Sequence, residues 1–305
     1  MSLPPKRFAL GSQQSAETLE LAAVKGRSLW DDARRRLVRN RAAMASIIVL
    51  GLLLLVAILG PLLAPFPYDQ VNKTDTWAAP LQQGHVLGAD ALGRDLLSRI
   101  MVGLGVSLLV GVVATFVSLV IGVAWGATAG YIGGRVDELM MRIVDVLYSL
   151  PFIFFVILLM VVFGRNFILL FLAIGAVEWL TMARIVRGQT MSLKEKEFVE
   201  AARAAGVSGF GIVARHIVPN LLGPVVVYIT LTIPGVILAE SFLSFLGLGV
   251  QPPMASLGTL VSYGASYMEL TPWLLIFPAI TMVVTLMCFN FIGDGLRDAI
   301  DPKDR

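Results

Sequence analysis

Three long stretches without a charged residue limit what this chain can fold into. They cover residues 42–68, 100–134 and 241–268, and each is at least 27 residues long. An apolar helix needs about 20 residues to cross the roughly 30 Å hydrocarbon core of a bilayer. Apolar residues also make up 57% of the chain, which is more than a water-facing core can bury. We therefore expect an all-α polytopic membrane protein.

The spacing of charges and helix breakers predicts six transmembrane helices. The predicted spans are residues 42–65, 100–134, a segment from the turn around Arg142 to Phe163, Phe167 to about Arg187, 216–239 and 270–293. Near the start of the third span, Arg142 and Asp145 are spaced to form an i, i+3 ion pair. Glu178 lies near the middle of the fourth span, where an ionisable side chain should face protein or water.

Two segments are predicted to lie outside the spans. Residues 66–99 are polar and rich in Pro and Gly, as in an ordered outer loop. In that loop His85 is close in sequence to Asp90 and Asp95, and we favour a structural hydrogen-bonded loop over a metal site because only one His is present. Residues 241–268 contain too many Gly and Pro for a lipid-exposed helix, so we interpret them as a re-entrant or outer-surface segment.

A ridge of glycines marks the second span as a helix with close neighbours. The glycines recur at every fourth position, at Gly122, Gly126, Gly130 and Gly134. Small residues let membrane helices approach closely, and such packing replaces the hydrophobic drive that is missing in lipid. We predict that this ridge packs tightly against another helix.

The polar segment between the fourth and fifth spans, residues 189–219, has the pattern of a short amphipathic helix. Its predicted apolar face follows an i, i+3, i+4, i+7 spacing and consists of Phe198, Ala201, Ala202 and Ala205. The opposite face carries the charged residues Lys194, Lys196, Glu197, Glu200 and Arg203. Gly206 is placed to end this helix, and Ser208 to cap a second short helix before Pro219 restricts the chain again.

The distribution of Lys and Arg predicts the orientation. With six spans and a cytoplasmic N-terminus, 20 of the 24 basic residues lie inside, and Lys73, Arg94, Arg99 and Arg165 lie outside. Residues 1–41 then form a cytoplasmic segment whose helix, with Leu29, Trp30, Ala33 and Leu37 on one side, lies on the inner membrane surface. No cleavable signal peptide is apparent, and residues 294–305 are expected to form a cytoplasmic tail.

Several motifs together resemble the permease subunits of bacterial ABC importers. Glu200-Ala201-Ala202, Gly206 and Pro219 match the loop with which these permeases dock on their ATPase subunit. His216 and Val218 stand where the general pattern usually has Ile and Leu, which looks like the peptide-importer branch. Segments similar to the C-type permeases of oligopeptide and dipeptide importers are 85–95, 240–253 and 293–302.

The resemblance implies a type I ABC importer permease fold in the bacterial inner membrane, with residues 100–293 as the core domain. The implied partners are a homologous permease, two cytoplasmic ATPase subunits, an extracytoplasmic peptide-binding protein and membrane lipid, but no nucleic acid. The implied docking and coupling residues are Phe198, Glu200, Ala201, Ala202, Gly206, His216 and Pro219. Glu178 and Glu240 are candidates for the pathway or an interface. No ATPase activity is expected of this chain, because a P-loop needs Gly-Lys and this dipeptide does not occur. No metal or cofactor is expected either.

Alternatives remain at this point. Oligopeptide, dipeptide and nickel importers share this permease scaffold, so the substrate is open. A self-contained secondary transporter would also have membrane carboxylates such as Glu178, but it would not need the 189–219 loop. The amphipathic helix could instead lie on lipid, although a face made mostly of Ala binds lipid poorly and suits a shallow protein groove.

Overall fold

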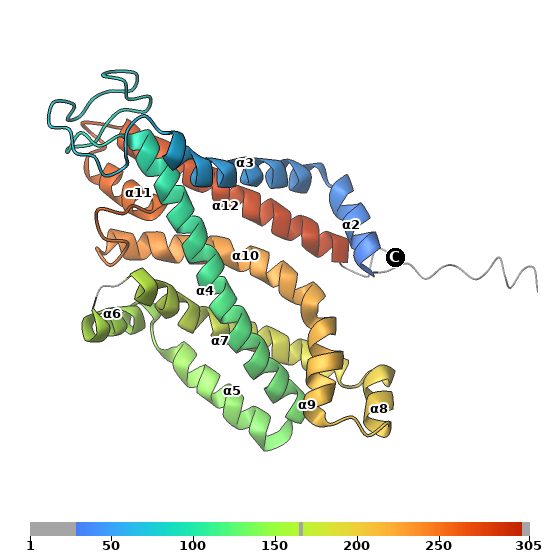
Figure 1. Cartoon of the computed structure of the whole chain (residues 1–305). Helices are drawn as coiled ribbons and strands as arrows, with labels where there is room; N and C mark the ends of the chain where they lie inside the picture. Colours follow the sequence, from blue (N-terminus) through green and yellow to red (C-terminus); the bar gives the residue numbers. More distant parts are fainter. Residues whose placement is uncertain (1–28, 165–166, 301–305) are drawn as a thin grey trace, which may run out of the picture.

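The computed structural model describes residues 29–164 and 167–300, and every regular element in these ranges is a helix. Long helices run side by side, with a loop-rich cap at one end and the short helices α8 and α9 at the other (Figure 1). The helices are, in chain order, α2 (Leu29–Arg39), α3 (Arg41–Leu63), α4 (Leu96–Ile132), α5 (Gly134–Ser149), α6 (Phe152–Phe163), α7 (Phe167–Leu193), α8 (Glu197–Ala204), α9 (Gly209–Ile212), the π-helical turn η1 (Val213–Ile217), α10 (Val218–Phe245), α11 (Leu257–Ser266) and α12 (Trp273–Ile300).

Five helical runs in the described ranges are long and apolar enough to span a membrane. They are α3, α4, α7, α12 and the continuous run Gly209–Phe245. The pair α5 and α6 would make a sixth, but its two helices meet at 85°. The mostly helical architecture with five or six candidate spans agrees with the predicted fold class.

The third predicted span is broken, and Pro151 explains the break. Leu150 has an extended backbone with ψ 131°, as expected for a residue before proline, because the proline ring disfavours the helical conformation there. The predicted ion pair between Arg142 and Asp145 is also wrong. Asp145 instead pairs with Arg184 of α7 at 2.8 Å, so it links two helices rather than stabilising one.

The glycine ridge of α4 packs against α7. A side chain at Gly122 would overlap Met182, one at Gly126 would overlap the carbonyl oxygen of Ala183, and one at Gly130 would overlap Thr190. The prediction of a tight neighbour is therefore confirmed for these three glycines. It is wrong for Gly134, where a Cβ atom would meet nothing within 4 Å and where φ is +56° at the start of α5.

The cap before α4, which was predicted to be the outer loop, is a hydrogen-bonded loop around His85, as predicted. The side chain is 1% exposed, and its Nδ1 lies 2.8 Å from Asp95 Oδ1 while Nε2 lies 3.4 Å from Asp75 Oδ2. Asp95 also caps α4 by accepting a hydrogen bond from the Ser98 amide at 2.7 Å. Helix α4 consequently begins at Leu96, four residues before the predicted start of the second span at residue 100.

The segment predicted to be re-entrant or on the outer surface contains the end of α10 and the whole of α11. Helix α10 continues to Phe245, and α11 begins at Leu257 after a turn. Tyr263 of α11 accepts a hydrogen bond from the Ala91 amide of the outer loop at 3.3 Å. Burial raises the pKa of the Tyr263 phenol above its usual value. The segment thus holds the outer loop onto the helices.

The two ends of the chain also differ from the prediction. Ala33 of α2 is buried and Leu37 lies beside Gly295 of α12, so this part of the predicted lipid-facing stripe packs on the protein. Residues 1–28 of the predicted cytoplasmic segment lie outside the described residues. Helix α12 reaches Ile300, so residues 294–300 of the predicted tail continue the last span, and residues 301–305 lie outside the described ranges.

Candidate coupling site

Helix α8 is a two-turn helix that a glycine ends. Gly206 has a φ of +79°, a left-handed conformation that glycine adopts without strain. The Val207 amide donates to the Ala202 carbonyl at 3.1 Å and the Gly206 amide to the Arg203 carbonyl at 3.0 Å. This pair of bonds is the Schellman motif, which satisfies the last carbonyls of a helix. The predicted end of the helix is confirmed.

The inward face of α8 differs from the predicted apolar face. Val199 is fully buried and Ala202 is 8% exposed, and both belong to a core cluster that includes Ile212, Ile217 and Leu221. Val199 was missed by sequence reasoning, although its i, i+3 spacing to Ala202 was visible in the sequence. Only Ala202 of the predicted apolar set faces the subunit.

The outward face of α8 is partly apolar and has no covering element in the described chain. Phe198 is 39% exposed, and Ala201 and Ala205 are exposed at i+3 and i+7 from it. Glu200 and Arg203 are exposed beside them. Aromatic residues and arginine are enriched at protein interfaces, so exposed Phe198 and Arg203 on one uncovered helix are compatible with a protein-docking site.

Helix α9 follows α8 directly and starts as predicted. Ser208 caps it by accepting a hydrogen bond from the Gly211 amide at 3.2 Å. Phe210 of α9 is 84% exposed and follows α8 closely in the sequence. Sequence reasoning missed this residue, although an aromatic side chain flanked by Gly209 and Gly211 in a polar segment was a visible signal.

The restriction expected from Pro219 does not interrupt the helix, because Val218 before it has helical angles of φ −56° and ψ −44°. The chain passes from α9 through η1 into α10 without leaving a helical conformation, and Pro219 is the second residue of α10, which directly follows the π-helical turn. His216 lies half-buried in η1. Its carbonyl accepts a hydrogen bond from Asn220 Nδ2 at 2.6 Å, so the predicted docking residues His216 and Pro219 belong to the base of α10 rather than to α8.

Charged contacts fix the end of α7 that leads into α8. Arg187 donates two hydrogen bonds to Asp137 of α5, at 2.5 and 2.6 Å. Lys194 Nζ donates to the Gly130 carbonyl of α4 at 3.1 Å. The base from which α8 projects is therefore tied to two other helices.

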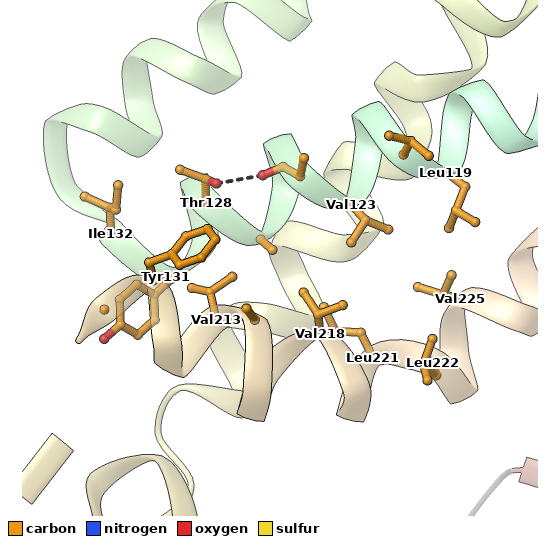
Figure 2. A pocket seen from close by; sticks show the side chains of 16 residues that line it. Leu119, Val123, Thr128, Tyr131, Ile132, Val213, Val218, Leu221, Leu222 and Val225 are labelled. Carbon is orange, nitrogen blue, oxygen red and sulfur yellow. Dashed lines mark hydrogen bonds between the residues drawn. The ribbon is translucent and has the colours of Figure 1, made fainter. Parts of the chain in front are cut away.

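An apolar groove of about 760 Å³ lies between α4 and the α9–α10 run. Figure 2 shows Leu119, Val123 and Tyr131 of α4 facing Val218 and Leu221 of α10 across it. The Thr128 hydroxyl is satisfied by the Ala124 carbonyl of its own helix at 2.7 Å. The groove therefore offers almost no polar group to a ligand, and its lining is typical of a membrane-embedded surface.

The two membrane carboxylates have different surroundings. Glu178 of α7 is half-buried and lines a cavity of about 680 Å³ at the bend between α5 and α6, together with Tyr148 and Thr181. Glu240 of α10 is fully buried inside the subunit, so it offers no surface to a pathway or partner in this conformation. The described residues contain no group of three or more His, Cys, Asp or Glu side chains placed to hold a metal ion.

Comparison with known proteins agrees with this architecture. Residues 122–305 match the family model of the binding-protein-dependent transport system inner membrane component, and residues 28–80 match the N-terminal TM domain of oligopeptide transport permease C. The chain is 58% identical over 299 residues to the oligopeptide transport system permease protein OppC of Escherichia coli, covering 96% of this chain and 99% of that protein. It is 42% identical over 306 residues to the dipeptide transport system permease protein DppC of Bacillus subtilis, covering 99% and 94%.

One solved structure has the same fold. An inward-facing form of the MetNI methionine ABC transporter superposes with a TM-score of 0.55 at 21% identity, covering 68% of this chain and 96% of that chain. At this identity the likeness concerns the fold alone.

Proposed function

Since the chain belongs to the family of binding-protein-dependent transport system inner membrane components, we propose that it is one of two permease subunits of an ATP-driven oligopeptide importer. It forms the translocation pathway with a homologous permease. Two cytoplasmic ATPase subunits supply the energy, and an extracytoplasmic peptide-binding protein delivers the substrate. The chain itself hydrolyses nothing.

The observation that carries this proposal is the outward face of α8. Phe198, Ala201 and Ala205 form an exposed apolar strip on a helix that projects from the bundle. Its inward face is anchored by Val199, so force applied to α8 is transmitted to the helices beneath it. A rigid helix with one anchored and one free face suits a lever between a permease and an ATPase.

The orientation that we propose places α8 in the cytoplasm. The segment from the end of α7 through α8 to η1 carries six basic residues, Arg184, Arg187, Lys194, Lys196, Arg203 and Arg215. Such an excess of basic residues is typical of the cytoplasmic side of a membrane. ATP is hydrolysed on that side, so the α8 face is accessible to an ATPase.

We infer the oligopeptide substrate from the names of similar proteins and not from the shape or chemistry of a pocket in this chain. The E. coli protein named for oligopeptide transport is 58% identical to this chain, and the B. subtilis protein named for dipeptide transport is 42% identical. We therefore favour oligopeptides, with dipeptides as the second candidate. We propose that Glu178 faces the pathway, because it is the carboxylate that lines the cavity at the α5–α6 bend.

The experiment is reconstitution. The chain, produced together with its partner permease, both ATPase subunits and the binding protein, should co-purify with the ATPases and hydrolyse ATP faster when the peptide-loaded binding protein is added. A chain that takes up peptide in liposomes without ATPase subunits would instead be a secondary transporter, and the proposal would be wrong.

A further inference from the structure

Glu240 is a buried carboxyl group near the outer end of α10. Its Oε1 accepts a hydrogen bond from Ser244 Oγ, one turn later on the same helix, at 2.8 Å. The same oxygen accepts a hydrogen bond at 2.7 Å from Ser256 Oγ, which belongs to the start of α11. Burying a carboxyl group is costly unless its hydrogen bonds are made, so these bonds point to a specific role for the residue.

Ser256 is the residue that begins α11. Its hydroxyl donates to Glu240 and also accepts a hydrogen bond from the Thr259 amide at 3.0 Å, which caps the helix. The next amide, that of Leu257, donates to Ser107 Oγ of α4 at 3.0 Å. Side-chain bonds therefore hold the first turn of α11 to two membrane helices at once.

The backbones of α10 and α11 are in close contact at this point. A Cβ on Gly258 would lie 2.8 Å from Glu240 Oε2. Among the described residues this second carboxyl oxygen has no hydrogen-bond partner. Glycine at position 258 thus allows the approach, and the Glu240–Ser256 bond fixes it.

Helix α10 connects this contact to the coupling site. The run from Gly209 to Phe245 is helical throughout its 37 residues, which corresponds to about 55 Å at 1.5 Å per residue. Its inner end follows α8 directly, and its outer end reaches α11 (Figure 1). Helix α11 in turn holds the outer loop through the bond between Tyr263 and the Ala91 amide.

We propose that Glu240 is a positioning residue that locks α11 to α10, so that movement of α10 at the coupling site is transmitted to the outer cap. The inference rests on the proposed function and deepens it. In this role Glu240 touches neither substrate nor ATPase. It couples the state of the ATPases to the surface that receives the binding protein.

The test uses the reconstituted complex and compares basal ATP hydrolysis with hydrolysis stimulated by the peptide-loaded binding protein. Glu240→Ala should leave the basal rate within about twofold and reduce the stimulated increment about tenfold, as expected for loss of one buried hydrogen-bonded partner. Glu240→Gln keeps the shape and one carbonyl acceptor, so it should restore most of the stimulation. A structural defect would lower the basal and the stimulated rates together.

Ser244→Ala is the matched control. It removes a hydrogen bond to the same carboxyl oxygen, but from within α10, and leaves the link to α11 in place. It should keep wild-type stimulation. Equal losses in Ser244→Ala and Glu240→Ala would overturn the inference, because the link between the helices would then be irrelevant.

Ser256→Gly keeps the inference testable if Glu240→Ala fails to assemble. Glycine is an acceptable helix N-cap, so this variant removes the link to Glu240 and largely preserves α11. It should lose stimulation as Glu240→Ala does, and the double variant should be no worse, because both changes remove one contact. Wild-type stimulation in Ser256→Gly would contradict the inference. A wild-type complex without stimulation would instead overturn the proposed function, and this inference with it.

Discussion

Arg187 of α7 binds Asp137 of α5 through two parallel hydrogen bonds of 2.5 and 2.6 Å, although the two residues are 50 positions apart. Asp137 is 10% exposed and Arg187 is 33% exposed at the side chain. The pair fixes α5 to the helix that leads into α8. One helical turn before it on α7, Arg184 binds Asp145 at 2.8 Å, but there the carboxylate is 64% exposed.

The difference in exposure predicts that the two ion pairs contribute unequally to the stability of the protein. Asp137→Ala should destabilise the purified protein by about 2 kcal/mol, because it leaves a partly buried guanidinium without its bidentate partner. Asp145→Ala should cost less than about 1 kcal/mol, since exposed pairs are screened by solvent. Thermal unfolding in detergent measures both. Equal decreases of the unfolding temperature in the two variants would mean that burial does not decide how much each ion pair stabilises the protein.

Gly206 should tolerate asparagine but not valine. No atom lies within 4 Å of a Cβ placed at this position, so there is space for a side chain. The backbone φ of +79° is what limits the choice of residue. A β-branched residue in a left-handed conformation costs on the order of 1–2 kcal/mol, and asparagine adopts it more readily. Gly206→Val should redirect α9 and abolish stimulated ATP hydrolysis. If this variant imports peptide at the wild-type rate, the α8 segment is not the coupling element.

The outward face of α8 should contribute unequally to ATPase binding. Phe198→Ala removes an aromatic contact and should weaken binding by about 2 kcal/mol, which is typical of an aromatic anchor. Glu200→Ala removes an exposed charge and should cost about 1 kcal/mol or less. Titration of the ATPase subunit onto the permease pair in nanodiscs gives both values. Unchanged affinity in the Phe198 variant would exclude this face as the docking surface.

Glu178→Gln should reduce transport without affecting assembly. The substitution keeps the side-chain volume at the 680 Å³ cavity and removes the charge. If the carboxylate contacts the substrate, uptake should fall about tenfold, the loss expected for one charged contact. Glu138→Gln, an exposed carboxylate on α5, is the matched control. Normal uptake in both variants would show that the ionisation of Glu178 has no role in transport.

The proposed orientation can be tested with single cysteines. Cys288 is the only native cysteine and is buried, so Cys288→Ala provides a silent background. Gln83→Cys on the outer loop should react with a membrane-impermeant maleimide in intact cells. Lys196→Cys, just before α8, should react only after the membrane is opened. Labelling of both positions from outside would place α8 on the wrong side for an ATPase.

The sequence was sufficient to predict the spanning helices but not their ends. The uncharged run 42–68 has few helix breakers before Pro65, and this combination identified α3. The bend between α5 and α6 was not predicted, although Pro151 indicates it. A hydropathy pattern shows that a segment is apolar but not where its helix changes direction. The partner of Asp145 was unpredictable, since a sequence shows neighbours within one helix and not the arginine that a second helix brings.

At the coupling site the chemistry was predicted better than the geometry. The positions of Gly206 and Ser208 were correct, because caps are local and depend on residue type alone. The buried face was not, because Phe198 and Val199 are both apolar. A sequence does not distinguish a face that packs on its own subunit from one that is kept for a partner.

The three α4 glycines that contact α7 have a consequence for motion. Where a single methyl group would collide with the opposing helix, two helices cannot slide past one another without first separating, and separation in lipid would forfeit the contacts that hold them together. Helices α4 and α7 therefore behave as one rigid body. Any rearrangement between outward-open and inward-open states must be taken up elsewhere, at the α5–α6 bend or between this pair and α10.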